Sequence, residues 1–277
     1  MKTKKAESIF TIVVSLIAVI AIFVVIIVGI RSKNAGNSND SAEEVTKTET
    51  GEFTRVDIRL INSNIEILDS DDSSIKIVYF EQGNNTYTYS AKDGFIELTE
   101  KARPTFFSCS GWNLEPKTAK LYLPIGWVGI LKVETVTGWL ELNNRTGLKQ
   151  LSMNTITGKI ALTNTNVDEY IDLEVITGSI TISDVKANQY IKMETTTGAI
   201  KLTNIEALTG ITAETTTGNI TAVIKGVKED FNIEMAALTG SVYLNGVKVS
   251  KEFTSYSGDK KISLETTTGS VKLDFAE

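Results

Sequence analysis

A Thr-Gly pair that returns at a nearly fixed interval constrains this chain more than any other feature of its sequence. The pairs occupy positions 137–138, 157–158, 177–178, 197–198, 217–218, 239–240 and 268–269, so the intervals are 20 residues four times, then 22 and 29. Self-similarity at a fixed period is typical of proteins built from one stacked supersecondary unit. We therefore expect residues 131–277 to form a regular repeat domain.

Aliphatic and polar residues alternate on both sides of each Thr-Gly pair, for example in residues 171–175 and 180–182. Such alternation predicts half-buried strands. Because like residues return in register, the strands are expected to stack as parallel coils about 4.8 Å apart. The expected interior columns lie seven and five residues before the Gly, and two and four after it. The predicted fold class is all-β, a β-solenoid with coils of about 20 residues.

A second corner is expected six residues after the Gly, where Asn144, Asn164, Asp184 and Asn204 recur. These residue types tolerate positive φ. Because side chains alternate along a strand, the Thr before each Gly and five threonines two positions earlier are expected to point inward. There their hydroxyl groups can form hydrogen bonds from coil to coil. The alternative is a flat Thr array that recognises ice or a glycan, which requires the corner to turn these residues outward.

The N-terminal region predicts a membrane anchor. Residues 1–8 form a basic tail, and residues 9–30 contain no charged residue. Twenty-two residues of helix reach about 33 Å, enough to cross a bilayer. A cleaved secretory signal is the alternative, but its apolar core is usually shorter. The basic residues favour the N-terminus inside, so we expect a single-pass protein of the cytoplasmic membrane with an extracytoplasmic C-terminal domain.

Two further regions separate the anchor from the repeats. Residues 31–51 have the polar composition of a solvated tether. Residues 52–130 alternate at irregular spacing and are predicted to start or cap the solenoid. Within them, residues 103–117 gather aromatic and Pro residues, as a packing cap or as a recognition loop.

Three short patterns resemble a known family. They are the Phe53-x-x-Val56-x-Ile58 opening, the strand of residues 120–124 that ends in Pro124, and the Thr-x-Thr-Gly-x-Ile coils. Together they resemble the bacterial putative adhesins, the toast-rack-type β-solenoid domains of envelope-stress proteins. The resemblance covers residues 53–275 and implies a single-stranded right-handed β-helix displayed at the cell surface. It implies no catalytic or ligand-binding residue.

Composition removes several classes of function. The chain has no His, one Cys (Cys109) and a net charge of −6. Without His, Ser-His-Asp and Cys-His catalysis and most transition-metal sites are excluded, and a lone Cys allows no internal disulfide. No basic patch with interleaved aromatic residues is present, so nucleic acid is not an expected partner. No catalytic residue, cofactor or metal ligand is assigned.

The one candidate binding feature is an acidic stripe, defined as Glu174, Glu194 and Glu214, four residues before the Gly in successive coils. In one interpretation these carboxylates are solvated and screened, helped by Lys132 and Lys192 in the next outward column. In the other they bind calcium or a basic peptide, because hard cations prefer oxygen ligands. An acid/base pair for glycoside cleavage would need a buried partner to split the two pKa values.

The sequence thus predicts a non-enzymatic, surface-exposed interaction module, either adhesin-like or sensing envelope stress. Its partners are expected to be the membrane, through residues 9–30, and an envelope protein or a glycan. Two alternatives remain. One is a self-assembling envelope scaffold joined end to end through unpaired strand edges. The other, less favoured, is an enzyme acting on cell-wall carbohydrate.

Overall fold

A computed structural model describes residues 42–81, 85–101 and 116–276, and this part of the chain is almost entirely β-strand. The strands are β1 (Glu43–Glu49), β2 (Arg55–Ser70), β3 (Ile75–Glu81), β4 (Thr86–Lys92), β5 (Phe95–Lys101), β6 (Lys117–Pro124), β7 (Gly129–Thr137), β8 (Leu140–Asn143), β9 (Leu148–Ala187), β10 (Tyr190–Thr197), β11 (Ile200–Ala207), β12 (Gly210–Thr217), β13 (Ile220–Lys225), β14 (Phe231–Thr239), β15 (Val242–Leu244), β16 (Val247–Val249), β17 (Glu252–Tyr256), β18 (Lys260–Thr268) and β19 (Val271–Ala276). A single turn of 3-10 helix, η2 (Lys228–Asp230), precedes β14. The all-β prediction is confirmed.

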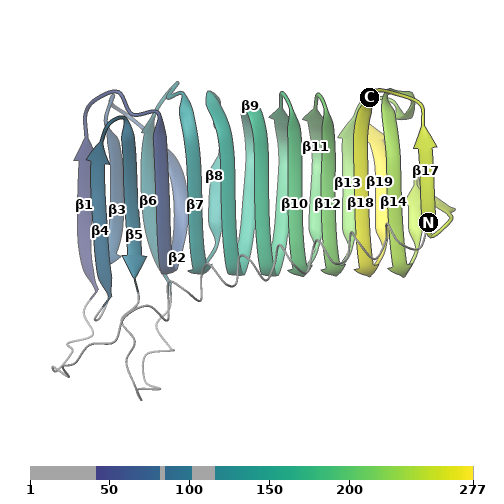
Figure 1. The fold of residues 1–277 in the computed structure, drawn as a ribbon, viewed down its shortest axis with the longest axis horizontal. Helices are drawn as coiled ribbons and strands as arrows, with labels where there is room; N and C mark the ends of the chain where they lie inside the picture. The colour runs from purple at the N-terminus through teal and green to yellow at the C-terminus, as the bar shows by residue number, and fades with distance from the viewer. Residues whose placement is uncertain (1–41, 82–84, 102–115, 277) are drawn as a thin grey trace, which may run out of the picture.

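The strands form a long rack of two packed faces (Figure 1). Sheet 1 holds the strands before each Thr-Gly corner, in the order β4, β5, the first half of β2, β7, two segments of β9, β10, β12, β18, β14 and β17. Sheet 2 holds the strands after it, in the order β1, β3, β6, the second half of β2, β8, two segments of β9, β11, β13, β19, β15 and β16. The coils between the two ends pair in parallel and in register, as the repeat predicts.

The core lies between the two sheets and consists of the four predicted aliphatic columns. Leu131, Ile171 and Ile211 are among the buried residues seven positions before the Gly, and Ile180 and Leu202 among those that follow it. At about 25 cal/mol per Å² of apolar surface, each such side chain contributes roughly 1.5–3 kcal/mol when buried. Stacked repetition of this burial explains how a chain without disulfides in its described part is stabilised.

The order of the coils departs from the order of the chain at both ends. The coil β18–β19 inserts between β12–β13 and β14–β15. At the other end, β2 inserts between the strands β5 and β6 and the coil β7–β8. The order of the coils in the stack therefore differs from their order in the chain. Because every coil carries the same columns, any order pairs like residues with like, and spacing alone cannot choose among them.

Antiparallel strands close both ends of the rack. β1 pairs with β3 and β4 with β5 at one end, while β16 pairs with β15 and β17 with β14 at the other. Covering a parallel stack with short, charged antiparallel strands limits edge-to-edge pairing. The predicted tether over residues 31–51 is thus wrong for Glu43–Glu49, whose alternating Val45, Lys47 and Glu49 pair with β3.

The two corners of each coil have the backbone that their residues require. Asn144, Asn164, Asp184 and Asn204 all adopt left-handed φ between 48° and 60°, which confirms the second corner. Their side chains form a ladder, in which the Asn164 amide donates to the Asn144 carbonyl oxygen at 2.9 Å. Asn and Asp are among the few non-glycine residue types that occupy this region readily.

The Thr columns behave differently from each other. The five threonines two positions before the Thr-Gly pair are buried. Four of their hydroxyl groups donate to the glycine carbonyl of the neighbouring coil, for example Thr155 to Gly138 at 3.2 Å and Thr215 to Gly198 at 3.1 Å, and Thr135 donates to the Ser63 carbonyl oxygen at 3.0 Å. The threonines directly before the Gly are exposed in all seven repeats. The inward prediction is therefore wrong for this column, because the chain turns at the corner before the period of two can continue.

The predicted basic tail (residues 1–8), membrane helix (residues 9–30) and Cys109 lie outside the described residues. In the described ranges, no helix has the length and apolar character needed to cross a membrane. The right-handed sense of the coil stays a prediction.

Candidate binding face

The acidic stripe lies on the outer surface of sheet 1, where the register of three strands brings its members together. Glu194 of β10 pairs with Glu174 of β9 on one side and with Glu214 of β12 on the other. Glu265 of β18 continues the column beyond Glu214. The structure therefore brings together all three predicted residues and adds a fourth, at the strand spacing of about 4.8 Å.

One member of the stripe, Glu194, forms an ion pair. Lys192 lies 3.0 Å from the Glu194 carboxylate. Among the described residues, no ion pair is formed by Glu174 or Glu214, and the Glu174 Oε1 atom is buried without a hydrogen-bond partner. Lys192 also lowers the pKa of Glu174 and Glu214 from a greater distance, and Lys261 lowers that of Glu214, but burial and the neighbouring carboxylates outweigh these charges.

Burial and repulsion together shift both outer carboxyl groups. Desolvation raises the pKa of Glu174 to about 7, and the negative charges of Glu194 and Asp172 add to this rise. The pKa of Glu214 is also raised to about 7, again chiefly by desolvation and then by Glu194 and Glu265. The two pKa values move in the same direction, so the column does not divide into an acid and a base as glycoside cleavage requires.

The other end of sheet 1 carries charges that are balanced, and sequence reasoning missed this cluster. Arg59 lies 2.9 Å from Glu134 and 3.2 Å from Glu97, and Lys132 lies 2.8 Å from Glu134. Asp57, only 1% exposed, pairs with Arg55 at 2.9 Å. The alternation in residues 56–59 indicates outward positions, but the partners come from β5 and β7, which only the register reveals.

A shallow polar hollow lies at the second corner, away from the stripe. Its lining includes Asn164, Asp184 and Lys225, together with Lys186 and Glu206, which pair at 2.8 Å. Within the described ranges, no group of three Asp, Glu, Cys or His residues is arranged to hold a metal ion. The stripe therefore has the geometry of an extended charged surface.

The stripe makes the stability of the protein depend on pH. Because the folded pKa of Glu174 and Glu214 (about 7) exceeds the ordinary value of 4.5, the folded state holds more protons between these pH values. Their contribution to stability is therefore present below pH 4.5 and is lost as the pH rises through 7. After allowance for solvent screening, we expect each to cost about 1–2 kcal/mol at pH 8.

This prediction is checked by chemical unfolding of the wild type and of Glu174→Gln/Glu214→Gln at pH 5 and pH 8. The double variant is expected to be more stable than the wild type at pH 8 and to gain little at pH 5. Glu229→Gln, at an exposed position on η2, is the matched control and should change neither value. An equal effect of the double variant at both pH values would contradict the shifted carboxyl groups.

Comparisons with known proteins found one family model and several solved structures. The family model described as Toastrack DUF4097 matches residues 53–273. No curated protein matches the chain. The crystal structure of a putative cell adhesion protein from Clostridium sporogenes is 16% identical with a TM-score of 0.43, over 85% of this chain and 100% of that one. A putative adhesin from Bacteroides fragilis is also 16% identical with a TM-score of 0.43, over 86% and 99%. A putative adhesin from Parabacteroides distasonis is 11% identical with a TM-score of 0.36, over 86% and 98%.

Proposed function

Because the chain belongs to the Toastrack DUF4097 family, we propose that it is a non-enzymatic binding module of the cell envelope, adhesin-like or part of an envelope-stress system. In this proposal residues 9–30 anchor it in the cytoplasmic membrane with the rack on the outer side. The observation that carries the proposal is the acidic stripe, which gathers three carboxylates on one sheet although, among the described residues, only Glu194 of these three forms an ion pair. A partner with a basic surface would supply the missing charge.

The charge of the stripe explains why a basic protein surface is the preferred partner. Bringing a cation beside Glu174 and Glu214 would offset their mutual repulsion with Glu194 and restore their ionised form near neutral pH. Electrostatic complementarity of this kind mainly raises the association rate and the specificity. Binding is therefore expected to weaken as salt rises, because exposed charges are screened over about 8 Å at physiological ionic strength.

The scaffold alternative is less well supported than the binding module. End-to-end assembly needs a terminal coil with a free edge. Both ends of the described rack instead carry antiparallel strands, and the edge strand β17 with the residue before it presents Lys251 and Glu252. The enzyme alternative gains no support from Glu174 and Glu214, because both pKa values are raised to about 7 and do not divide into an acid and a base.

The proposal is tested by capture from envelope extracts with the full-length protein in detergent, with and without calcium, followed by mass spectrometry. A basic envelope protein should be captured by the wild type and at least tenfold less by Glu174→Gln/Glu194→Gln/Glu214→Gln. A matched triple variant at Glu66, Glu141 and Glu229, which lie outside the stripe, should retain capture. Capture that is indifferent to the stripe, or that yields only the protein itself, would refute the proposal.

A further inference from the structure

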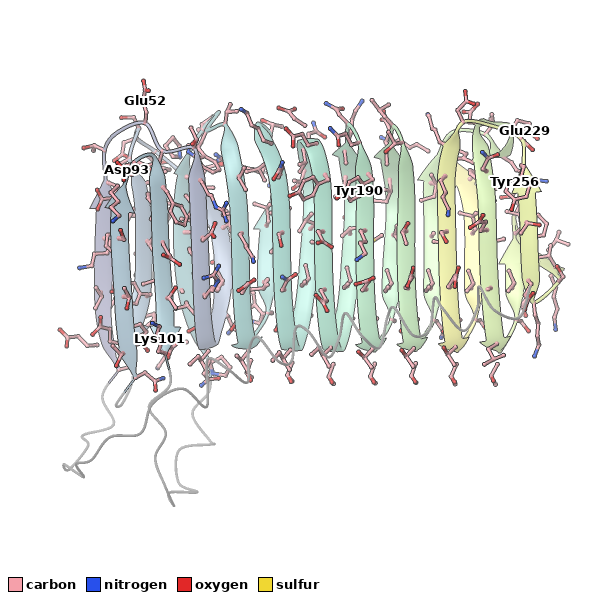
Figure 2. All side chains as sticks on the ribbon, viewed as in Figure 1. Glu52, Asp93, Lys101, Tyr190, Glu229 and Tyr256 are labelled. Carbon is pink, nitrogen blue, oxygen red and sulfur yellow. The ribbon has the colours of Figure 1, made fainter. Side chains whose placement is uncertain are left out.

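A pair of stacked tyrosines lies on the same outer face as the acidic stripe, at the start of β10. The rings of Tyr170 and Tyr190 are 5.3 Å apart between centroids and only 6° from parallel. Tyr190 is 42% exposed, and Figure 2 shows it on the surface of the rack, away from both ends. A large aromatic ring that stays half open to solvent, although a neighbour fixes one of its faces, is a ready surface for stacking.

The platform is held in place before any ligand arrives. The Tyr170 hydroxyl donates to Gln150 Oε1 at 2.7 Å, and the Gln150 amide donates in turn to the Glu169 carboxylate. Tyr190 then packs flat on the ring that this chain of hydrogen bonds has oriented. Because few rotamers are left to restrict, binding on Tyr190 would cost little conformational entropy.

The second face of Tyr190 lies on the side of β12, where the residue in register with it has no side chain, and we call this position the slot. The residue in register with Tyr190 on the next strand of sheet 1 is Gly210. A Cβ atom at Gly210 would lie 2.8 Å from the Lys261 carbonyl oxygen, so the close approach of β18 explains the glycine. Lys261 itself extends away from the slot, because its ammonium group pairs with Glu234 on the coil beyond, at 3.1 Å.

The slot has the size of one stacked ring. Gly210 separates Tyr190 from Lys261, so the two flanking backbones are two strand spacings apart, about 9.6 Å. A ring in van der Waals contact with Tyr190 would lie about 3.5–4 Å from it. That leaves space on the far side for the lysine stem and for water.

The rim of the slot offers an ammonium group and a hydroxyl group. Lys192 and Thr212 follow one another in the adjacent outward column, on the two strands that carry Tyr190 and Gly210, and Asp172 continues this column on the Tyr170 side. Lys192 disfavours a cationic ligand, and the negative charge of Asp172, which acts on Tyr190, disfavours an anionic one. A neutral ligand with an apolar face and an edge of hydroxyl groups satisfies the aromatic ring and the polar rim together.

We propose that the slot formed by Tyr190 and Gly210 binds a pyranose ring of a neutral glycan, stacked on Tyr190 and hydrogen-bonded at its edge by Lys192 and Thr212. This inference goes beyond the proposed function, because it adds a second site with a different ligand class. The exposed face of sheet 1 then carries two sites, one for a ring and one for basic groups.

The test titrates the full-length protein in detergent with four probes, the tetramers of glucose, N-acetylglucosamine, galactose and mannose, by saturation-transfer NMR and calorimetry. At least one tetramer is expected to bind, and Tyr190→Ala should weaken it about tenfold or more. Tyr190→Phe should keep the affinity. Tyr256→Ala, which removes a tyrosine that is 70% exposed on the edge strand β17, is the matched control and should also keep it.

Three results would overturn the glycan site: no binding of any tetramer, binding that Tyr190→Ala leaves unchanged, or binding that Tyr256→Ala abolishes equally. Titration with free tyramine distinguishes a glycan site from a site for aromatic amines. Binding of this aromatic cation without binding of any sugar would show that the slot accepts amines instead. None of these results depends on the stripe. If the stripe captures a protein partner but no sugar binds, the proposed function stands and the glycan site is refuted. If a sugar binds but the stripe captures no partner, only the glycan site stands.

Discussion

Gly198→Ala is expected to lower the free energy of unfolding by about 3 kcal/mol or more, a loss typical of overpacking combined with backbone strain. A Cβ atom at Gly198 would overlap the carbonyl oxygen of Gly178 in the coil below. The backbone there has φ of +154°, which side-chain-bearing residues rarely adopt. Relief of the overlap requires two coils to separate, and the Thr195 hydroxyl would then lose its bond to the Gly178 carbonyl.

The control for this substitution is Gly246→Ala. Gly246 has φ of +73°, but a Cβ atom there would meet nothing within 4 Å. Its alanine variant should therefore cost only the strain of a left-handed backbone, about 1 kcal/mol. Urea unfolding followed by circular dichroism measures both variants. Equal losses would show that backbone conformation, and not the approach of neighbouring coils, explains the glycine column.

The glycines of the Thr-Gly pairs show which features of the fold the sequence alone can predict. The interval of the Thr-Gly pairs predicts the strands, the corners and the four interior columns, because period and residue type are local properties. The reason that the corner must be glycine is not local. It depends on the carbonyl oxygen of the preceding coil, so Gly178 and Gly198 constrain each other only once the coils are stacked.

The candidate site shows the same division. The acidic stripe could be predicted, because its three Glu residues share one position in consecutive 20-residue repeats. The balancing cluster of Arg59, Glu97 and Glu134 could not, since it joins segments of irregular spacing. The Tyr190 slot also escaped, because the stack on Tyr170 and the gap at Gly210 become visible only when the three coils are aligned.

The order of the coils at the C-terminal end gives the second large prediction. Thr217 of β12 is in register with Thr268 of β18, and Thr268 is in register with Thr239 of β14. All three are exposed. Neighbouring strands place such Cα atoms about 4.8 Å apart, within the range that a disulfide spans, whereas the two outer threonines are about 9.6 Å apart and beyond it. A chain stacked in sequential order would make Thr217 and Thr239 the neighbours.

With Cys109 replaced by serine, Thr217→Cys/Thr268→Cys is therefore expected to form a disulfide nearly completely on mild oxidation, and Thr217→Cys/Thr239→Cys to remain reduced. Closing a loop of about 51 residues should add about 4 kcal/mol to the free energy of unfolding in the chain-entropy model. Mass spectrometry after thiol alkylation measures the bond, and unfolding with and without reductant measures its effect.

A disulfide in the second pair instead of the first would mean that the last coil caps the stack, and that β14 pairs directly with β12. If the first pair bonds, the coil β18–β19 lies inside the stack with a coil on either side, so it is protected from fraying by two strand interfaces, whereas a coil at the end of the stack has one.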